Sequence, residues 1–541
     1  MPAVVRLRLL YFPAVESETA HAGRQIARAA GVVMVGLLLS NLVGLARQIL
    51  ILRAFGTSAD LDAFFAAQRL PQLLFNLAAG GALASAFVPT FTALLTRQQR
   101  EAAWRLASSV GSLLFLLLAA VGAVGVLAAP WLVRHVIAPG FISADQQALT
   151  VSLLRVMLLT PVIFGVSGLL MGILNAHQHF LLPALAPAFY SGGIIFGLLA
   201  WSPEIGTHGL AWGTVLGAAL HLLVQLPGLR AQTPRFTLDL GLDNPAVRQV
   251  GRLMAPRLLG AAAVEVNFLV NTILASAQPE GSLTALANAL TVMLMPQALI
   301  AQALAVAALP TFSAQVARQE WKALRTTLAQ ALRGVLYLAL PASLGLILLR
   351  RPIVAMLFQG GAFGVRSTEL VAWALLWYAA GLVGHALLEV VVRAFYAMQD
   401  TRTPVAVGVG AMTLNVVFSL LFARAFIANG LPPHGGLALA NSLATALESA
   451  MLLVILRRRL GGLEVSQMRR GVAATIAASA IMGLGLWGWL SLAEGRPAWW
   501  VGGVGAFLGA LVYFGITRVL GAPEARLAPS LLQERLRGRG K

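Results

Sequence analysis

Long apolar runs constrain this chain more than any other feature of its sequence. About fourteen stretches of roughly 20 or more mostly apolar residues follow one another. They cover residues 29–52, 62–94, 106–134, 148–174, 180–201, 206–228, 250–276, 283–311, 327–349, 367–395, 403–427, 435–456, 470–492 and 497–519. The runs are continuous, whereas transmembrane β-strands alternate apolar and polar residues. The sequence therefore predicts an all-α polytopic membrane protein with about fourteen transmembrane helices.

Composition agrees with a membrane protein and excludes several classes of site. Of 541 residues, 58% are hydrophobic and 11% charged, which leaves too little polar surface for a soluble protein of this size. The net charge is +19, but the basic residues are scattered between apolar runs, so we expect no nucleic-acid partner. There is no cysteine, which excludes disulfides and thiolate metal sites. We expect no metal and no cofactor.

The distribution of basic residues predicts the topology. Arginines gather in alternate loops between the apolar runs, and this asymmetry favours a cytoplasmic position for both termini. Arg24 and Arg28 precede the first run, and no small-residue cleavage site follows a short hydrophobic core. We therefore expect residues 1–28 to form a cytoplasmic lead and not a removable signal peptide. Residues 520–541 are expected to form a basic cytoplasmic tail.

An internal repeat divides the chain into two similar halves. The segment Pro89–Ala93, followed by Arg97-Gln98, recurs 221 positions later as Pro310–Ala314, followed by Arg318-Gln319. Ala176, Gln178 and Pro183 recur at the same offset as Ala397, Gln399 and Pro404. Two matches in one register predict duplication of a unit of about six helices, in two parallel lobes around a central cavity. The predicted segments are an N-lobe (29–228), a linker (229–249), a C-lobe (250–456) and two extra helices (457–519).

Four charged residues lie in or beside the first two apolar runs. They are Arg47, Arg53, Asp62 and Arg69. A charged side chain at membrane depth costs about 3 kcal/mol or more unless it faces a protein interior or a water-filled cavity. These residues therefore predict a polar pathway through the membrane. A structural ion pair between Arg47 and Asp62 is the alternative.

Longer motifs in the same region resemble a known family. The segments Gly44-Leu45-Ala46-Arg47, Arg53-Ala54-Phe55-Gly56, Asp62-Ala63-Phe64-Phe65, Arg69-Leu70-Pro71 and Ala86-Phe87-Val88-Pro89 resemble the opening of MviN/MurJ-type lipid II flippases. The later segments Asn271–Ser276 and Arg393–Val405 agree with it, and the resemblance extends over nearly all the apolar runs. It implies a member of the multidrug/oligosaccharidyl-lipid/polysaccharide exporter superfamily that works by alternating access.

The resemblance implies a substrate and residues that bind it. The family's cargo is a peptidoglycan precursor linked to a polyprenyl pyrophosphate, and arginine suits a pyrophosphate because it offers planar, permanently charged, bidentate donors. Arg47 and Arg69 are the expected head-group ligands, and Arg53 lies near the outer end of the first helix. Asp62 is expected to be their electrostatic partner or a gate residue. The resemblance also implies that the protein lies in the bacterial inner membrane, contacts membrane lipids and transports as a single chain.

Polar residues of the seventh run could couple transport to an ion. Arg257, Glu265 and Asn267 lie in it, and a buried carboxylate readily shifts its pKa. Glu265 could carry a coupling proton or cation, or it could form a structural pair with Arg257 or with a neighbouring helix. We favour the structural pair for Glu265, and coupling or gating by these three residues stays the alternative.

Some positions depart from the family's pattern. Asn41, Phe75, Gly80 and Ala289 stand where the family usually carries charged residues. The chain also has no phosphate-binding loop and no hydrolase motif, so transport would draw on an ion gradient, the membrane potential or the cargo gradient. Two other functions stay open. They are a cation-coupled antiporter of small molecules on the same fold, and a non-transporting scaffold for envelope assembly.

Overall fold

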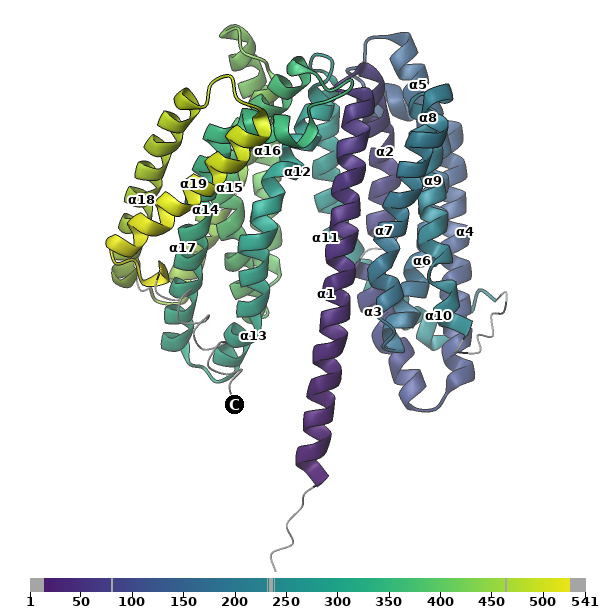
Figure 1. Ribbon diagram of the computed structural model, residues 1–541. Coiled ribbons are helices and arrows are strands. Elements are labelled where there is room, and N and C mark those ends of the chain that lie inside the picture. Colours follow the sequence, from purple (N-terminus) through teal and green to yellow (C-terminus); the bar gives the residue numbers. More distant parts are fainter. Residues whose placement is uncertain are drawn as a thin grey trace, which may run out of the picture. The chain divides into compact units, whose positions relative to one another are not determined.

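Helices account for nearly all of the structure. The computed structural model describes residues 14–78, 81–230, 232, 237, 239–462 and 465–525. The predicted N-terminal lead, the basic tail and Gly80 therefore lie partly or wholly outside the described residues. Within that range the helices are α1 (Ala14–Phe55), α2 (Ala59–Ala78), α3 (Gly81–Thr96), α4 (Arg100–Leu132), η1 (Val133–Ile137), α5 (Ala144–Met157), α6 (Leu159–Ala176), α7 (Leu181–Phe196), η2 (Gly197–Trp201), α8 (Ser202–Ile205), α9 (Thr207–Leu223), α10 (Leu226–Arg230), α11 (Pro245–Ser276), α12 (Ser282–Gln297), η3 (Ala298–Gln302), α13 (Ala303–Ala317), α14 (Trp321–Phe358), α15 (Val365–Ala397), α16 (Arg402–Ala428), α17 (His434–Arg459), α18 (Val465–Leu492) and α19 (Ala498–Val519) (Figure 1).

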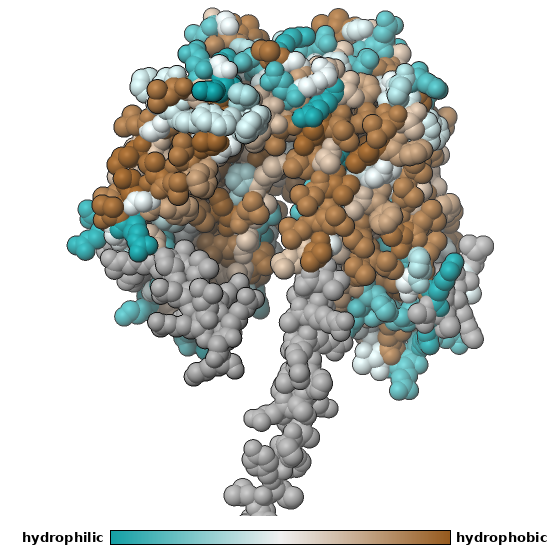
Figure 2. All heavy atoms as spheres, in the orientation of Figure 1, coloured by the Kyte–Doolittle hydropathy of each residue, from teal (hydrophilic) through white to brown (hydrophobic). Residues whose placement is uncertain are grey.

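The prediction of an all-α membrane protein is confirmed. Among the described residues, 12 helices are long and apolar enough to cross a membrane, and two shorter apolar helices cover Ala86–Thr96 and Val264–Ser276. These two lie within the second and seventh predicted runs. Figure 2 shows apolar residues along the sides of the helices and hydrophilic residues at the helix ends, as expected of helices that lie in lipid.

The chain divides into two compact units. The first unit comprises Met1–Gln48, Leu74–Val124 and Val156–Leu258, and the second comprises Ile49–Leu73, Gly125–Arg155 and Leu259–Lys541. In the first unit, apolar residues of α3, α4 and α6 form a core that includes Phe87, Phe91 and Trp104. In the second unit, α13, α14, α15 and α17 share a core around Phe312 and Phe395. The lobe boundaries that the repeat suggests stay a prediction.

The two extra C-terminal helices pack on α14. Tyr337 of α14 and Leu486 and Tyr513 of α18 and α19 belong to one buried apolar cluster. The Tyr337 hydroxyl also shares a 2.9 Å hydrogen bond with Thr517, and Arg333 pairs with Glu524 just beyond α19. Figure 1 shows α18 and α19 beside α14.

The internal repeat has a counterpart in the local structure. Gln98 and Gln178 adopt the left-handed conformation, with φ of 58° and 60°, and their partners 221 positions later, Gln319 and Gln399, have φ of 58° and 59°. Each glutamine ends a helix, and the residue after it donates a hydrogen bond to the carbonyl five positions before. This is the Schellman helix ending, in which the left-handed residue satisfies carbonyls that the helix leaves free. The residues that donate these four hydrogen bonds are Gln99, His179, Glu320 and Asp400.

A glycine between α1 and α2 holds a close contact with a later loop. Gly56 has a φ of +64°, and a Cβ added there would lie 2.6 Å from the carbonyl oxygen of Ala362. Both residues belong to the second unit. The backbone nitrogen of Ala362 also donates a 2.7 Å hydrogen bond to the carbonyl of Arg53. The loop around Ala362 therefore fits against the end of α1 only because residue 56 lacks a side chain.

We expect Gly56→Ala to destabilise the protein by about 2 kcal/mol or more, because the left-handed conformation costs an alanine about 1 kcal/mol and the overlap with Ala362 adds to it. Gly430→Ala is the matched control, since Gly430 lies just after α16 with a φ of +68° and has nothing within 4 Å of its added Cβ. The midpoint of thermal unfolding in detergent measures both effects. Equal midpoints for the two variants would show that the contact with Ala362 is unimportant.

Candidate functional site

Arg69 and Glu265 form an ion pair inside the second unit. Arg69 lies in the middle of α2 and Glu265 in α11, and the Arg69 Nη2 atom lies 3.4 Å from Glu265 Oε2. The two side chains are 16% and 9% exposed. Partial burial removes water from both charges, so the pair must compensate for that loss. The structure thus joins a predicted head-group ligand to a predicted coupling residue.

The surroundings of Arg69 leave part of its guanidinium unused. Its Cζ atom lies 4.6 Å from the centre of the Phe268 ring, one helical turn from Glu265 on α11. An arginine over an aromatic face is held by a cation–π interaction. The buried Nε atom of Arg69 has no hydrogen-bond partner in the part of the chain that the structure describes. The guanidinium therefore carries one buried donor that these contacts leave unused.

Asp62 makes its contacts with the start of α12 and not with Arg69. Its carboxylate accepts hydrogen bonds from the backbone nitrogen of Gly281 at 2.7 Å and from the backbone nitrogen and hydroxyl of Thr284 at 2.8 and 2.6 Å. Asp62 is only 3% exposed. The first backbone N–H groups of a helix have no partner within it, and an anion there also interacts favourably with the helix dipole. Asp62 thus caps α12 from another helix.

Arg47 lies in the first unit, on the face of α1 toward α7. Its Nη1 atom is 3.5 Å from the Ser191 hydroxyl, and its Cζ atom is 5.8 Å from the centre of the Tyr190 ring. Two turns earlier, the Ser40 hydroxyl donates a 2.9 Å hydrogen bond to the carbonyl of Ala184. The α1 and α7 helices therefore pack closely. The contact with Ser191 is long and uses one of the three nitrogens of the Arg47 guanidinium.

Arg53 stands at the end of α1 and has an exposed side chain. Its Nε atom lies 3.4 Å from the position of an added Cβ on Gly360, in the glycine-rich turn after α14. An isolated bridge between Gly360 and Phe363 closes that turn. The arrangement positions the turn on α1, and the basic group points away from the protein core.

Asn267 belongs to a cluster of amides, whereas Arg257 is exposed. The Asn415 side-chain nitrogen lies 3.5 Å from the side-chain oxygens of both Asn267 and Asn271. The Ser419 hydroxyl donates to Asn415 at 3.3 Å. The cluster therefore links α11 to α16 through side-chain amides and a hydroxyl group. Arg257 has an exposed side chain in the earlier part of α11, and Glu265 pairs with a neighbouring helix, one of the alternatives that the sequence left open.

Comparison with known proteins now identifies the family. A family model described as "Lipid II flippase MurJ" matches residues 51–503. The chain belongs to the MurJ family. A relative from Burkholderia cenocepacia named "Lipid II flippase MurJ" is 33% identical over 430 residues, which cover 78% of this chain and 82% of that protein. A "Probable lipid II flippase MurJ" from Rhizobium tropici is 30% identical over 450 residues, covering 82% and 83%.

Solved structures agree on the fold. The chain matches "Lipid II flippase MurJ, inward closed conformation" with a TM-score of 0.77 at 23% identity, covering 90% of this chain and 98% of that one. It also matches an inward-facing MATE family transporter of the MOP superfamily with a TM-score of 0.64 at 17% identity, covering 80% and 98%. Membership of the MurJ family, together with the apolar helices, makes this a multi-pass protein of the bacterial inner membrane and a transporter rather than a catalyst.

The positions that depart from the MurJ family's pattern have different surroundings. Ala289 of α12 is fully buried, so the packing there leaves no room for a long charged side chain. Phe75 stacks on Phe164, with ring centroids 4.5 Å apart, and packs in the core of the first unit. Asn41 is exposed on α1. Gly80 lies outside the described residues.

Several contacts of the charged residues in this MurJ-family chain were not predicted from the sequence. Phe268 beneath Arg69, Thr284 beside Asp62 and Ser191 beside Arg47 come from helices distant in sequence. The pairs Asn267 and Asn271, and Asn415 and Ser419, are each four residues apart and so share one helix face. That spacing was the one signal in the sequence that could have indicated the amide cluster.

Three polar residues of α15 follow one another at intervals of four positions, at 385, 389 and 393. Arg393 and Glu389 form an ion pair at 3.1 Å, and the His385 ring shares a 3.1 Å hydrogen bond with the carbonyl of Gly381. Charged groups at i and i+4 can pair in this way, and Asn441 of α17 is a further hydrogen-bond partner of His385.

Proposed function

We propose that this protein flips lipid II across the cytoplasmic membrane by alternating access, with Arg69 as a ligand of the pyrophosphate. Its family supports the substrate, and the arrangement of Arg69 supports the role. The guanidinium is partly desolvated, lies over Phe268 and keeps a buried Nε atom without a hydrogen-bond partner among the described residues. An arginine in such surroundings binds an anion more strongly than one in water.

In this proposal Glu265 acts as a gate for Arg69. The carboxylate and the pyrophosphate compete for the same guanidinium, so substrate binding weakens the pair between α2 and α11. Release of the substrate lets the pair form again. A single ion pair between two helices can bias a two-state equilibrium in this way, because the ligand binds only one of its two arrangements. Asp62 would hold α12 in place beside this pair.

Arg47 is proposed as a second head-group ligand and Arg53 as a basic group at the outer end of α1. The long contact of 3.5 Å between Arg47 and Ser191 leaves the guanidinium available to phosphate oxygens. Asn267 and Arg257 remain candidates for coupling or gating, Asn267 through the oxygens of its amide cluster. We further propose that both termini are cytoplasmic and that one chain is the transport unit.

The two alternatives receive less support. An antiporter would be favoured by a Glu265 without a neighbouring cation, but Arg69 lies 3.4 Å away. A scaffold would be favoured by aromatic side chains that plug a central cavity, but Phe75 packs on Phe164. Neither observation excludes transport of lipid II.

Replacement of a bacterium's own lipid II flippase tests the proposal. Cells depleted of that flippase are expected to survive with the unchanged protein, and lipid II should reach the outer leaflet. The double variant Arg47→Ala and Arg69→Ala should fail, while Arg424→Ala, which removes an exposed arginine of α16, should succeed. Normal rescue by the double variant would refute the head-group assignment, and failure of the unchanged protein at normal membrane levels would refute the substrate.

A further inference from the structure

Arg47 is held by uncharged groups, whereas Arg69 is held by a carboxylate. The Arg47 Cζ atom lies 5.8 Å from the centre of the Tyr190 ring, and its Nη1 atom lies 3.5 Å from the Ser191 hydroxyl. These contacts direct the guanidinium without compensating its charge. A carboxylate partner would instead compete with a phosphate for the same donors. Whatever fixes the Tyr190 ring therefore also helps to fix the direction of Arg47.

The Tyr190 ring of α7 packs against α6 and α9. Phe164 of α6 meets it edge to face, with ring centroids 5.2 Å apart, and is itself only 6% exposed. On α9, an added Cβ on Gly217 would lie 2.9 Å from Tyr190 Cδ2, so the ring lies directly on that helix. A side chain in contact with two packed helices has few positions open to it. Phe164 and the backbone at Gly217 thus restrict where Tyr190 can point.

Phe164 in turn packs on a buried polar network. The His221 ring of α9 lies 5.2 Å from the Phe164 ring at an interplanar angle of 74°. The His221 Nδ1 atom shares a 2.7 Å hydrogen bond with the Ser167 hydroxyl. The Gln225 side-chain nitrogen donates to that hydroxyl and to the His221 carbonyl, each at 2.8 Å. These three residues are buried, and buried hydrogen bonds hold the imidazole in one orientation against Phe164.

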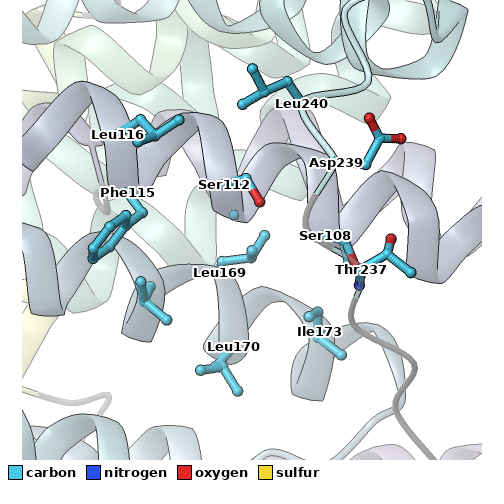
Figure 3. A pocket seen from close by; sticks show the side chains of 13 residues that line it. Ser108, Ser112, Phe115, Leu116, Leu169, Leu170, Ile173, Thr237, Asp239 and Leu240 are labelled. Carbon is cyan, nitrogen blue, oxygen red and sulfur yellow. Dashed lines mark hydrogen bonds between the residues drawn. The ribbon is translucent and has the colours of Figure 1, made fainter.

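The face of α6 that carries Phe164 differs from the face that packs on α4. A groove lies between α4 and α6 (Figure 3), and its α6 side consists of Val166, Leu169, Leu170 and Ile173. Phe164 and Ser167 lie one turn apart and contact α7 and α9 instead. The contacts from Gln225 to Arg47 all lie within the first unit. They form a continuous series through α9, α6, α7 and α1.

We infer that Phe164 is a positioning residue for Arg47 and acts through the Tyr190 ring. This inference rests on the proposed role of Arg47 as a head-group ligand. An arginine side chain loses conformational entropy when a ligand fixes it. A ring that already directs the guanidinium reduces that loss, so the same pyrophosphate binds more tightly. Phe164 contributes to affinity in this way without touching the ligand.

Binding of undecaprenyl pyrophosphate to the purified full chain in detergent tests the inference. We expect Phe164→Leu to weaken this binding about fivefold, the size of one cation–π contact. Binding of undecaprenol, which carries no phosphate, should stay unchanged. In an Arg47→Ala background, Phe164→Leu should have no further effect. Phe91→Leu is the matched control, since it truncates another buried ring of the first unit that packs on Trp104, and it should alter neither affinity.

Tyr190→Leu keeps the test decisive if Phe164→Leu unfolds. This change removes a half-buried ring and should cause the same loss of affinity for undecaprenyl pyrophosphate, again with none for undecaprenol. Three results would overturn the inference: equal losses for the two lipids, additive effects of Phe164→Leu and Arg47→Ala, or full affinity in both leucine variants. The first two would show that Phe164 has only a structural role.

The Arg47→Ala variant separates this inference from the proposed function. If Arg47→Ala weakens binding of undecaprenyl pyrophosphate while both leucine variants bind it fully, Arg47 remains a head-group ligand and only its positioning by Phe164 is refuted. If Arg47→Ala binds undecaprenyl pyrophosphate as tightly as the unchanged protein, the head-group assignment of Arg47 is refuted and the inference with it.

Discussion

Replacing Arg69 with alanine is expected to abolish rescue of flippase-depleted cells and to lower lipid II transport by more than about 30-fold. Loss of one partner of a buried charge pair typically costs about 2–5 kcal/mol, and about 1.4 kcal/mol corresponds to a tenfold change in rate. Transport into vesicles that contain the purified protein gives the rate directly. Arg424→Ala is the control, because it removes an exposed arginine without a described carboxylate partner.

Exchange of the two charges separates a ligand from a structural pair. The variant Arg69→Glu with Glu265→Arg keeps an ion pair between α2 and α11, so its thermal stability should recover relative to either single variant. Its transport should not recover, because the cation now comes from α11 and reaches a different place. Recovery of both properties would show that Arg69 has only a structural role. Recovery of neither would show that the local packing around Phe268 decides both.

Asp62→Ala is expected to destabilise the protein by about 2–4 kcal/mol, because three donors of α12 lose a charged acceptor in a buried place. The donors are the backbone nitrogens of Gly281 and Thr284 and the Thr284 hydroxyl. Thermal unfolding in detergent should show a midpoint lower by about 2–4 °C, because a chain of this length has a large entropy of unfolding. Asp62→Asn should have a smaller effect, since an amide oxygen still accepts hydrogen bonds but carries no charge.

Asp60→Ala is the matched control for this change. Asp60 lies two residues earlier on α2 and is exposed, so its loss should alter the midpoint little. An equal effect of the two alanine variants would show that the cap on α12 does not stabilise the fold. A normal midpoint together with lost transport in Asp62→Ala would instead support a direct role in the transport cycle.

The sequence predicted the larger architecture well because hydropathy acts over whole segments. Runs of about 20 apolar residues can satisfy their backbone groups in lipid only as helices, and small errors at their ends do not alter the number of spans. The repeat was also visible, since Gln98 and Gln319 kept both their identity and their role at the ends of helices.

The sequence did not predict which residues the charged side chains contact. Asp62 was expected beside an arginine, and it caps α12 through Gly281 and Thr284. Glu265 was weighed against Arg257 on its own helix, and it pairs with Arg69 on α2. In each case several partners of suitable charge were available, and only the rotation and height of packed helices select one of them.

By itself, the sequence determined that this chain is a helical membrane protein, that it carries an internal repeat, and that charged residues lie in or beside its first two spans. Those properties depend on composition and on spacing along the chain, which need no knowledge of distant contacts. Only the tertiary structure decided that Arg69 lies over Phe268 with Glu265, that Asp62 completes the start of α12, and that α4 and α6 enclose a groove. Such features depend on which helix faces meet, and that is set by packing between segments far apart in the sequence.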